Sequence, residues 1–107
     1  MTDKIIVYST CSSPEEAKKL ATHLVEHRLA ACVSVVSGVA SFYWWKGKVE
    51  QEAEIQLVIK TRRELFERLR TEWETLHSYE IPELIAVPIV EGAPNYLDWM
   101  ERELTPQ

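Results

Sequence analysis

The sequence has little glycine and cysteine, fewer basic than acidic residues, and no long apolar run. Its three glycines leave no glycine-rich loop of the kind that holds a phosphate group. Its two cysteines, Cys11 and Cys32, are too few for a disulfide framework and are typical of a reducing, cytosolic protein. Twelve Lys and Arg against seventeen Asp and Glu give a net charge of −5, which argues against nucleic acid as a partner.

Two further absences narrow the class of protein. The chain starts without a basic flank and a following apolar stretch, so we expect no signal peptide, no membrane segment and a cytoplasmic location. A Ser-His-Asp signature is also missing, and we expect no catalytic activity. The 107 residues, 46% of them apolar, are those of one globular domain over residues 1–107.

The start of the chain predicts a strand followed by a helix. Residues 4–10 contain β-branched and aromatic side chains and end at a polar cluster, as a buried strand does. Ser13 as N-cap, Pro14 at the first helical position and Glu16 three residues after the cap form a capping box. Apolar residues then recur at helical spacing, and the helix should end near residues 27–28.

The middle of the chain predicts a long β-hairpin. Residues 31–36 and 39–45 form one strand that bends at Gly38, because glycine permits a bulge. The turn is Lys46–Gly47–Lys48, and residues 49–60 form the return strand. We expect the face that carries its alternating acidic side chains to be solvated. These side chains are Glu50, Glu52 and Glu54.

The rest of the chain predicts a helix, a strand and a final helix. Thr61 and Glu64 have the spacing of a second capping box. The helix after them places large apolar groups on one face, namely Leu65, Phe66, Leu69, Trp73 and Leu76. A strand over residues 83–90 and a helix over residues 96–104 follow. The order β-α-β-β-α-β plus a terminal helix indicates an α+β, ferredoxin-like fold, with helices on one face of an antiparallel sheet.

The aromatic run from Phe42 to Trp45 breaks the alternation expected of a sheet with one wet face. Successive side chains point to opposite faces, so Phe42 and Trp44 share one face while Tyr43 and Trp45 share the other. Each ring can bury ~150–250 Å², so an uncovered pair is a large apolar patch for a monomer. We expect other subunits to cover it in a closed, symmetric assembly. The alternative is that the final helix folds back over this face.

Several motifs, in the same order, resemble those of the CutA divalent-cation tolerance family over nearly the whole chain. They are LAACV at 29–33, GVASFY at 38–43, Trp45 with GK at 47–48, VIKT at 58–61, HSYEIPE at 77–83, AVPI at 86–89 and YLDW at 96–99. The resemblance implies a ferredoxin-like subunit in a tight homotrimer, similar to the trimeric PII signalling proteins. It also implies a role in tolerance of copper and other divalent cations, with no established catalytic activity.

By the same resemblance, the copper-binding version of the family takes its ligands from three positions. They are a cysteine at the end of the first strand and two consecutive histidines before the loop tyrosine. Here they hold Ser9, Leu76 and His77, so only the last histidine is present. Cys11 lies two residues beyond the cysteine position and replaces it only if the loop bends back. The cofactor that the resemblance implies is Cu²⁺ or another divalent cation, and none is required for folding.

The candidate metal ligands are His77, Cys11 and Glu80. An imidazole and a carboxylate suit Zn²⁺ or Cu²⁺, but a site needs three or four ligands, which copies in an oligomer could supply. The alternative for His77 is a surface histidine near a helix C-terminus. Because a helix N-terminus lowers a thiol pKa, Cys11 could be reactive, and the alternative is an ordinary loop thiol. Cys32 is flanked by apolar residues and is expected to pack in the core.

A second candidate site is a cleft between neighbouring subunits, lined by Trp45, Lys60, Tyr79 and Glu83, where the likeness to PII proteins suggests that ligands bind. Three classes of function remain. The first is a trimeric metal-binding or metal-responsive protein. The second is a small-molecule sensor or interaction scaffold that uses this cleft. The third is a small hydrolase resembling acylphosphatase, which the missing phosphate-binding loop makes improbable.

Overall fold

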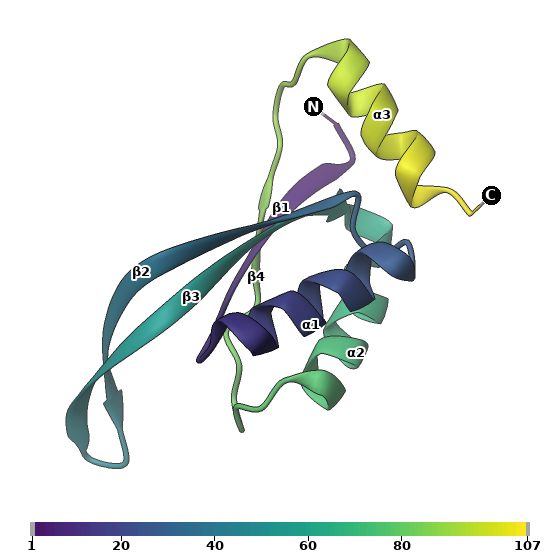
Figure 1. The fold of residues 1–107 in the computed structure, drawn as a ribbon. Coiled ribbons are helices and arrows are strands. Elements are labelled where there is room, and N and C mark those ends of the chain that lie inside the picture. The colour runs from purple at the N-terminus through teal and green to yellow at the C-terminus, as the bar shows by residue number, and fades with distance from the viewer. Residues whose placement is uncertain (1, 107) are drawn as a thin grey trace.

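The structure of the protein, a computed structural model, describes residues 2–106 as a four-stranded sheet with three α-helices (Figure 1). The elements in chain order are β1 (Lys4–Cys11), α1 (Pro14–Glu26), β2 (Cys32–Trp45), β3 (Lys48–Arg62), a 3-10 turn (Arg63–Leu65), α2 (Phe66–Leu76), β4 (Ile85–Pro88) and α3 (Pro94–Leu104). The strands lie in the order β2-β3-β1-β4, and each neighbouring pair is antiparallel. The predicted order of elements and the α+β class are confirmed.

The main core lies between the sheet and the helices α1 and α2, which lie side by side in Figure 1. Val7 of β1 and Leu57 and Ile59 of β3 are fully buried in it. From the helices, Leu24 of α1 and Trp73 of α2 belong to the same buried cluster and are also fully buried. Buried and half-buried residues alternate from Ile5 to Ser9 in β1 and from Ile55 to Arg62 in β3, so one face of these segments packs against the apolar faces of the two helices.

Ser13 caps α1 and Pro14 begins it, as the sequence predicts. Ser13 has an extended backbone, and its Oγ accepts a hydrogen bond of 3.1 Å from the backbone N–H of Glu16. Pro14 occupies the first helical position. The helix ends at Glu26, and Arg28 adopts a left-handed conformation with a φ of 59°, which turns the chain toward β2.

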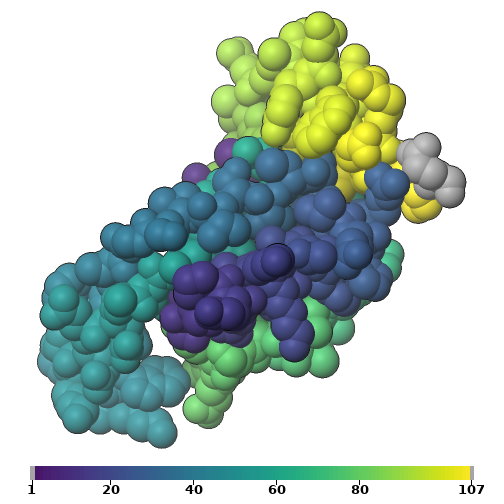
Figure 2. All heavy atoms as spheres, in the orientation of Figure 1, coloured from purple at the N-terminus to yellow at the C-terminus, as the bar shows by residue number. Residues whose placement is uncertain are grey.

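The β2–β3 hairpin is the most extended part of the molecule (Figures 1 and 2). A bulge separates Val36 from Val39, and Gly38 within it has a φ of 82°, which glycine adopts without strain. The turn has φ values of 49° at Lys46 and 85° at Gly47, as a two-residue type I′ turn requires. The predicted bend and the predicted turn are both confirmed.

The final helix, α3, packs at the opposite end of the sheet from the hairpin tip (Figure 1). Met100 and Leu104 form a second buried cluster with Ala31, at the start of the hairpin's first strand. Figure 2 shows α3 in yellow and the hairpin tip in teal at opposite ends of the molecule. The alternative in which the final helix covers the aromatic hairpin is therefore wrong.

Thr61 does not cap a helix, contrary to the prediction. It lies inside β3 opposite Ile5, and its Oγ1 donates a hydrogen bond of 2.7 Å to the carbonyl of Leu29. Strand pairing and this buried bond outweigh the local pattern, and α2 begins at Phe66 after the 3-10 turn, without a side-chain cap. The buried face of α2 is also shorter than predicted. Its last buried residue is Trp73, whereas Leu76 is 38% exposed.

Strand β4 is shorter than the predicted strand over residues 83–90. Only Ile85–Pro88 pairs with β1 as a strand, and one further bond of 3.0 Å runs from the Ile89 backbone N–H to the Lys4 carbonyl. Residues 77–84 lie outside the sheet and connect α2 to β4. In the described sheet, β4 and β2 are the two edge strands.

Candidate functional site

A pocket of about 720 Å³ lies between the hairpin and the segment that joins α2 to β4. The aromatic side chains that line it are Phe42, Tyr43, Trp45 and Tyr79, and the acidic ones are Glu54, Glu80 and Glu83. Within residues 2–106, no Lys or Arg lines it, so the pocket favours cations over anions. Figure 2 shows the tip of the hairpin standing clear of the rest of the molecule.

Three of the four predicted cleft residues meet at this pocket. Trp45 comes from the end of β2, and Tyr79 and Glu83 come from the segment before β4. The fourth, Lys60, lies elsewhere, in β3 between Ile6 of β1 and its partner in β2. The structure therefore brings together the aromatic and acidic members of the predicted set without the basic one.

A short hydrogen bond between Tyr79 and Glu54 closes the inner wall of the pocket. The Tyr79 hydroxyl donates to Glu54 Oε2 at 2.6 Å, and Glu54 is 7% exposed. Burial raises the pKa of Tyr79 far above its usual value, and the bond to Glu54 raises it further, so the phenol stays protonated. The expectation of a solvated acidic face is wrong for Glu54, because Tyr79 covers it, whereas Glu52 is exposed and Glu50 is half-buried.

The second carboxyl of note, Glu83, is an exposed residue at the edge of the pocket. Partial burial of its carboxyl raises the pKa of Glu83, and the neighbouring charge of Glu54 raises it further. A bound cation would lower this pKa, because it stabilises the ionised form. The pocket therefore holds a carboxylate pair whose mutual repulsion a cation would relieve.

His77 is a buried structural residue in this chain. Its side chain has no exposed surface. The backbone N–H of Tyr79 donates to Nδ1 at 3.0 Å, so Nδ1 is an acceptor and the ring proton lies on Nε2, which is 2.7 Å from the carbonyl of Thr10. Both ring nitrogens thus have protein partners, and the alternative of a surface histidine is wrong.

Cys11 is also buried, as the last residue of β1 and not as a loop thiol. Its Sγ donates to the carbonyl of Ser13 at 3.5 Å. Burial raises the pKa of the thiol, which opposes the lowering expected from the helix N-terminus and keeps the group protonated. Cys32 is half-buried in β2 and is not part of either buried core cluster.

The predicted metal ligands do not form a metal site within one chain. Among residues 2–106, no group of three or more His, Cys, Asp or Glu side chains is arranged to hold a metal ion. Ser9 stands where the resemblance implies a cysteine ligand, and here it has a structural role. Its hydroxyl accepts from Trp73 Nε1 at 3.0 Å and donates to the Glu83 carbonyl at 2.6 Å. These bonds tie the segment at the pocket to the core.

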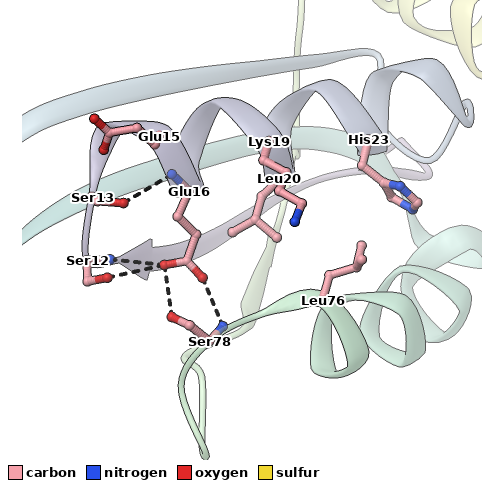
Figure 3. Close-up of a pocket in the computed structure, with 9 residues that line it drawn as sticks. All are labelled: Ser12, Ser13, Glu15, Glu16, Lys19, Leu20, His23, Leu76 and Ser78. Carbon is pink, nitrogen blue, oxygen red and sulfur yellow. Dashed lines mark hydrogen bonds between the residues drawn. The ribbon is translucent and has the colours of Figure 1, made fainter.

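A second network anchors the other end of that segment and was missed by sequence reasoning (Figure 3). The carboxylate of Glu16 accepts hydrogen bonds from the Ser78 backbone N–H at 2.9 Å and the Ser78 hydroxyl at 3.0 Å. It also accepts a bond of 3.3 Å from the Ser12 hydroxyl. The predicted capping box is therefore half formed, because the Glu16 side chain turns to the loop and not to the cap residue Ser13. These residues line a hollow of about 450 Å³.

Glu16 is expected to stabilise the fold in a pH-dependent way. Burial alone would raise its pKa, but the hydrogen bonds from Ser78 hold the pKa of Glu16 below its usual value of 4.5. Its contribution is therefore present above that value and is lost as the pH falls through the lowered pKa. Glu16→Ala should reduce the free energy of unfolding at pH 7 by about 1–3 kcal/mol, because the donors of Ser78 and Ser12 lose a charged acceptor.

Chemical denaturation of Glu16→Ala and of the unchanged protein at pH 7 and pH 3 measures this effect. The matched control is Glu15→Ala, since Glu15 is exposed in the same helical turn. The difference for Glu16→Ala should shrink at pH 3, whereas the control should change little at either pH. An equal loss for both variants at pH 7 would show that the loop contacts of Glu16 do not stabilise the fold.

Comparison with known proteins agrees with the sequence motifs and with the fold. The family model for the CutA1 divalent ion tolerance protein matches residues 5–103. The divalent-cation tolerance protein CutA of Thermus thermophilus is 44% identical over 95 residues, which are 89% of this chain and 92% of that protein. The chain belongs to the CutA1 divalent ion tolerance family.

Plant relatives and solved structures extend this comparison. The chloroplastic CutA of Arabidopsis thaliana is 45% identical over 97 residues, or 91% of this chain, which spans about half of that protein (53%). The crystal structure of CutA from Xylella fastidiosa has a TM-score of 0.94 and 40% identity, covering 97% of this chain and all of that one. The structure of the periplasmic divalent cation tolerance protein CutA from Archaeoglobus fulgidus has a TM-score of 0.92 and 39% identity, covering 95% and 99%.

Proposed function

We propose that this protein acts in tolerance of divalent cations, copper among them, as a homotrimer without catalytic activity. The match to the family model over residues 5–103 carries the proposal, because it covers both the hairpin and the segment that form the pocket. The family description names tolerance of divalent ions and no reaction. This description favours a metal-binding or metal-responsive protein over a small-molecule sensor or a hydrolase.

The exposed hairpin supports the homotrimer. Phe42 is 66% exposed, Trp44 is 73% exposed and Val49, paired with Trp44 across the hairpin, is 57% exposed. These three large apolar side chains lie on one hairpin and form an apolar patch, whose exposure to water is unfavourable. Copies of the chain can cover it, since the hairpin extends beyond the core and β2 and β4 are edge strands.

Carboxylates at the pocket are the groups best placed for weak cation binding. Glu80 and Glu83 line it, and both are exposed residues. His77 and Cys11 join them only if their internal bonds to Thr10 and Ser13 break. Two carboxylates from one chain leave a divalent cation with open positions, which water or a second copy fills.

Removing the two exposed carboxylates of the pocket, Glu80 and Glu83, should weaken cation binding there. In a Zn²⁺ titration followed by calorimetry, Glu80→Gln with Glu83→Gln is expected to lower the affinity about tenfold, equal to about 1.4 kcal/mol. Glu91→Gln is the matched control, because Glu91 is exposed and lies outside the pocket. Equal affinities for the double variant and the unchanged protein would show that Glu80 and Glu83 do not bind the cation.

A growth assay tests tolerance itself. A bacterial strain that lacks its own CutA is grown over a series of Cu²⁺ concentrations, with and without this chain. The proposal expects growth at higher Cu²⁺ when the chain is present. Identical growth curves with and without the expressed protein would contradict it.

The proposed location is the cytoplasm. Among residues 2–106, no helix is long and apolar enough to cross a membrane. The named relatives differ, since the Arabidopsis protein is called chloroplastic and the Archaeoglobus protein periplasmic. Cell fractionation with an antibody against this chain places it directly, and its recovery outside the cytoplasmic fraction would correct this part of the proposal.

A further inference from the structure

The pocket at the hairpin is much larger than a metal ion needs. Its volume of about 720 Å³ lies within the range of about 300–1,000 Å³ that is typical of small-molecule sites. Figure 2 shows a hollow between the tip of the hairpin and the segment that leads to β4. Within residues 2–106, no three His, Cys, Asp or Glu side chains are arranged to hold a metal ion. Size and donor arrangement therefore both favour a larger cation as a ligand of this pocket.

The hairpin lines the pocket with aromatic rings. Alternation along β2 places Tyr43 and Trp45 on one face of the hairpin, whereas Trp44 and its cross-strand partner Val49 lie on the other. Tyr43 and Trp45 line the pocket, and Tyr79 joins them from the segment before β4. These three rings are thus on a different face from Trp44 and Val49, which we propose that copies of the chain cover.

The Trp45 ring already attracts an ammonium group within the chain. Lys46 Nζ lies 5.8 Å from the centroid of this ring, within the distance of a cation–π contact. Lys46 itself is exposed and does not line the pocket. The contact arises because the negative face of an aromatic ring attracts a nitrogen cation. A ligand with an ammonium group can therefore use the same property of the rings that line the pocket.

The carboxylates make the potential in the pocket negative. Partial burial raises the pKa of Tyr43, and the negative charges of three glutamates on β3 raise it further. One of them, Glu54, binds the Tyr79 hydroxyl through Oε2, so it acts on the pocket chiefly through its charge. Glu80 and Glu83 are exposed and can contact a ligand directly. Charge and ring faces hold a bulky ammonium ion without coordinate bonds, whereas a metal ion needs several converging ligands.

We propose that the pocket binds an organic ammonium cation, whose carbon groups contact the aromatic rings and whose charge is balanced by the carboxylates. The rings are those of Tyr43, Trp45 and Tyr79, and the carboxylates are those of Glu54, Glu80 and Glu83. Aromatic cages recognise quaternary ammonium groups in this way. The inference goes beyond the proposed function, because it needs no divalent cation.

A titration of the full-length protein with choline, followed by NMR spectroscopy, tests the site. The control ligand is the neutral alcohol in which a carbon atom replaces the quaternary nitrogen of choline, so the shape is kept and the charge is lost. We expect saturable binding of choline with an upfield shift of its trimethyl protons, because ring currents shield protons above an aromatic ring. The neutral alcohol should bind at least about tenfold more weakly. Equal binding of the two ligands, or no binding of choline, would overturn the inference.

Two tyrosines of similar exposure supply a matched pair of variants. Tyr43 is 40% exposed and lines the pocket, whereas Tyr96 is 42% exposed and lies on α3, outside the pocket. Tyr43→Ala should lower the choline affinity about tenfold, and Tyr96→Ala should leave it unchanged. Trp45→Ala should have an effect similar to that of Tyr43→Ala, and Trp45→Phe should restore part of the affinity because it keeps a ring. Unchanged affinity in both Tyr43→Ala and Trp45→Ala would contradict the aromatic contacts.

The role of charge is tested with the carboxylates. Glu80→Gln with Glu83→Gln should weaken choline binding and leave binding of the neutral alcohol unchanged, because only the cation interacts with the lost charges. Glu91→Gln is the control, since Glu91 is exposed outside the pocket. An equal loss of both ligands would show that the substitutions disturb the shape of the pocket and that charge does not select the ligand. Circular dichroism melting verifies that each variant is folded.

The choline titration and the growth assay separate this inference from the proposed function. If choline does not bind the unchanged protein but the chain still protects cells from Cu²⁺, the inference fails and the proposed function stands. If choline binds as expected and the chain gives no protection, the proposed function fails and the pocket still has its ligand class.

Discussion

Replacing Phe42 and Trp44 with glutamate in one variant is expected to convert the proposed trimer to a monomer. Both side chains are more than 60% exposed in the single chain, at 66% and 73%. Covering such a side chain contributes about 1.5–3 kcal/mol, and a glutamate in the same contact adds the cost of desolvating a charge. Size-exclusion chromatography with light scattering should show 12.4 kDa for the variant, against about three times that mass for the unchanged protein.

The control for this variant adds negative charge elsewhere. Lys18 and Thr22 lie on the exposed side of α1, away from the hairpin. Lys18→Glu with Thr22→Glu should leave the assembly intact, because negative charge on α1 does not disturb the contacts of the apolar side chains on the hairpin. A hairpin variant that keeps the trimer mass would mean that other surfaces hold the copies together.

The second large effect is expected from Trp73→Ala, which should lower the free energy of unfolding by about 3–5 kcal/mol. Trp73 is completely buried in the main core, between α2 and the sheet. Its indole N–H donates to Ser9, whose hydroxyl in turn donates to the Glu83 carbonyl. The substitution therefore leaves a cavity and also releases one anchor of the pocket segment. Urea denaturation measures the first effect, and hydrogen exchange at residues 78–84 measures the second.

Leu76→Ala on the same helix is the control for the buried position. Leu76 is 38% exposed and belongs to neither core cluster, so its loss should cost less than about 1.5 kcal/mol. Exchange at residues 78–84 should stay close to that of the unchanged protein. If both variants lose the same stability, burial of Trp73 is not what holds α2 on the sheet.

Local patterns in the sequence were sufficient for most of the fold. The cap at Ser13 depends on residues within one helical turn, and the turn at Gly47 depends on neighbouring backbone angles, so both were predictable. Thr61 was not, because its hydroxyl bonds to Leu29, 32 residues away in the sequence, inside the folded core. A capping pattern carries no information about such a partner.

The candidate site shows the same limit. The aromatic and acidic residues of the pocket were identified by their type and by the family motifs, as Trp45 and Glu83 illustrate. The burial of Glu54 depends on Tyr79, which arrives from a segment 25 residues later. The environment of His77 depends on the Thr10 carbonyl, 67 residues away. Residue type predicted a ligand there, whereas the fold gives this imidazole two internal partners.

The mass of the unchanged protein in dilute solution tests the central claim most directly, namely that copies of the chain cover the apolar hairpin. Sedimentation equilibrium at micromolar concentration should give a single species of about three times the chain mass of 12.4 kDa. A stable, folded species of one chain mass over the whole concentration range would contradict the claim, because Phe42 and Trp44 would then remain in water.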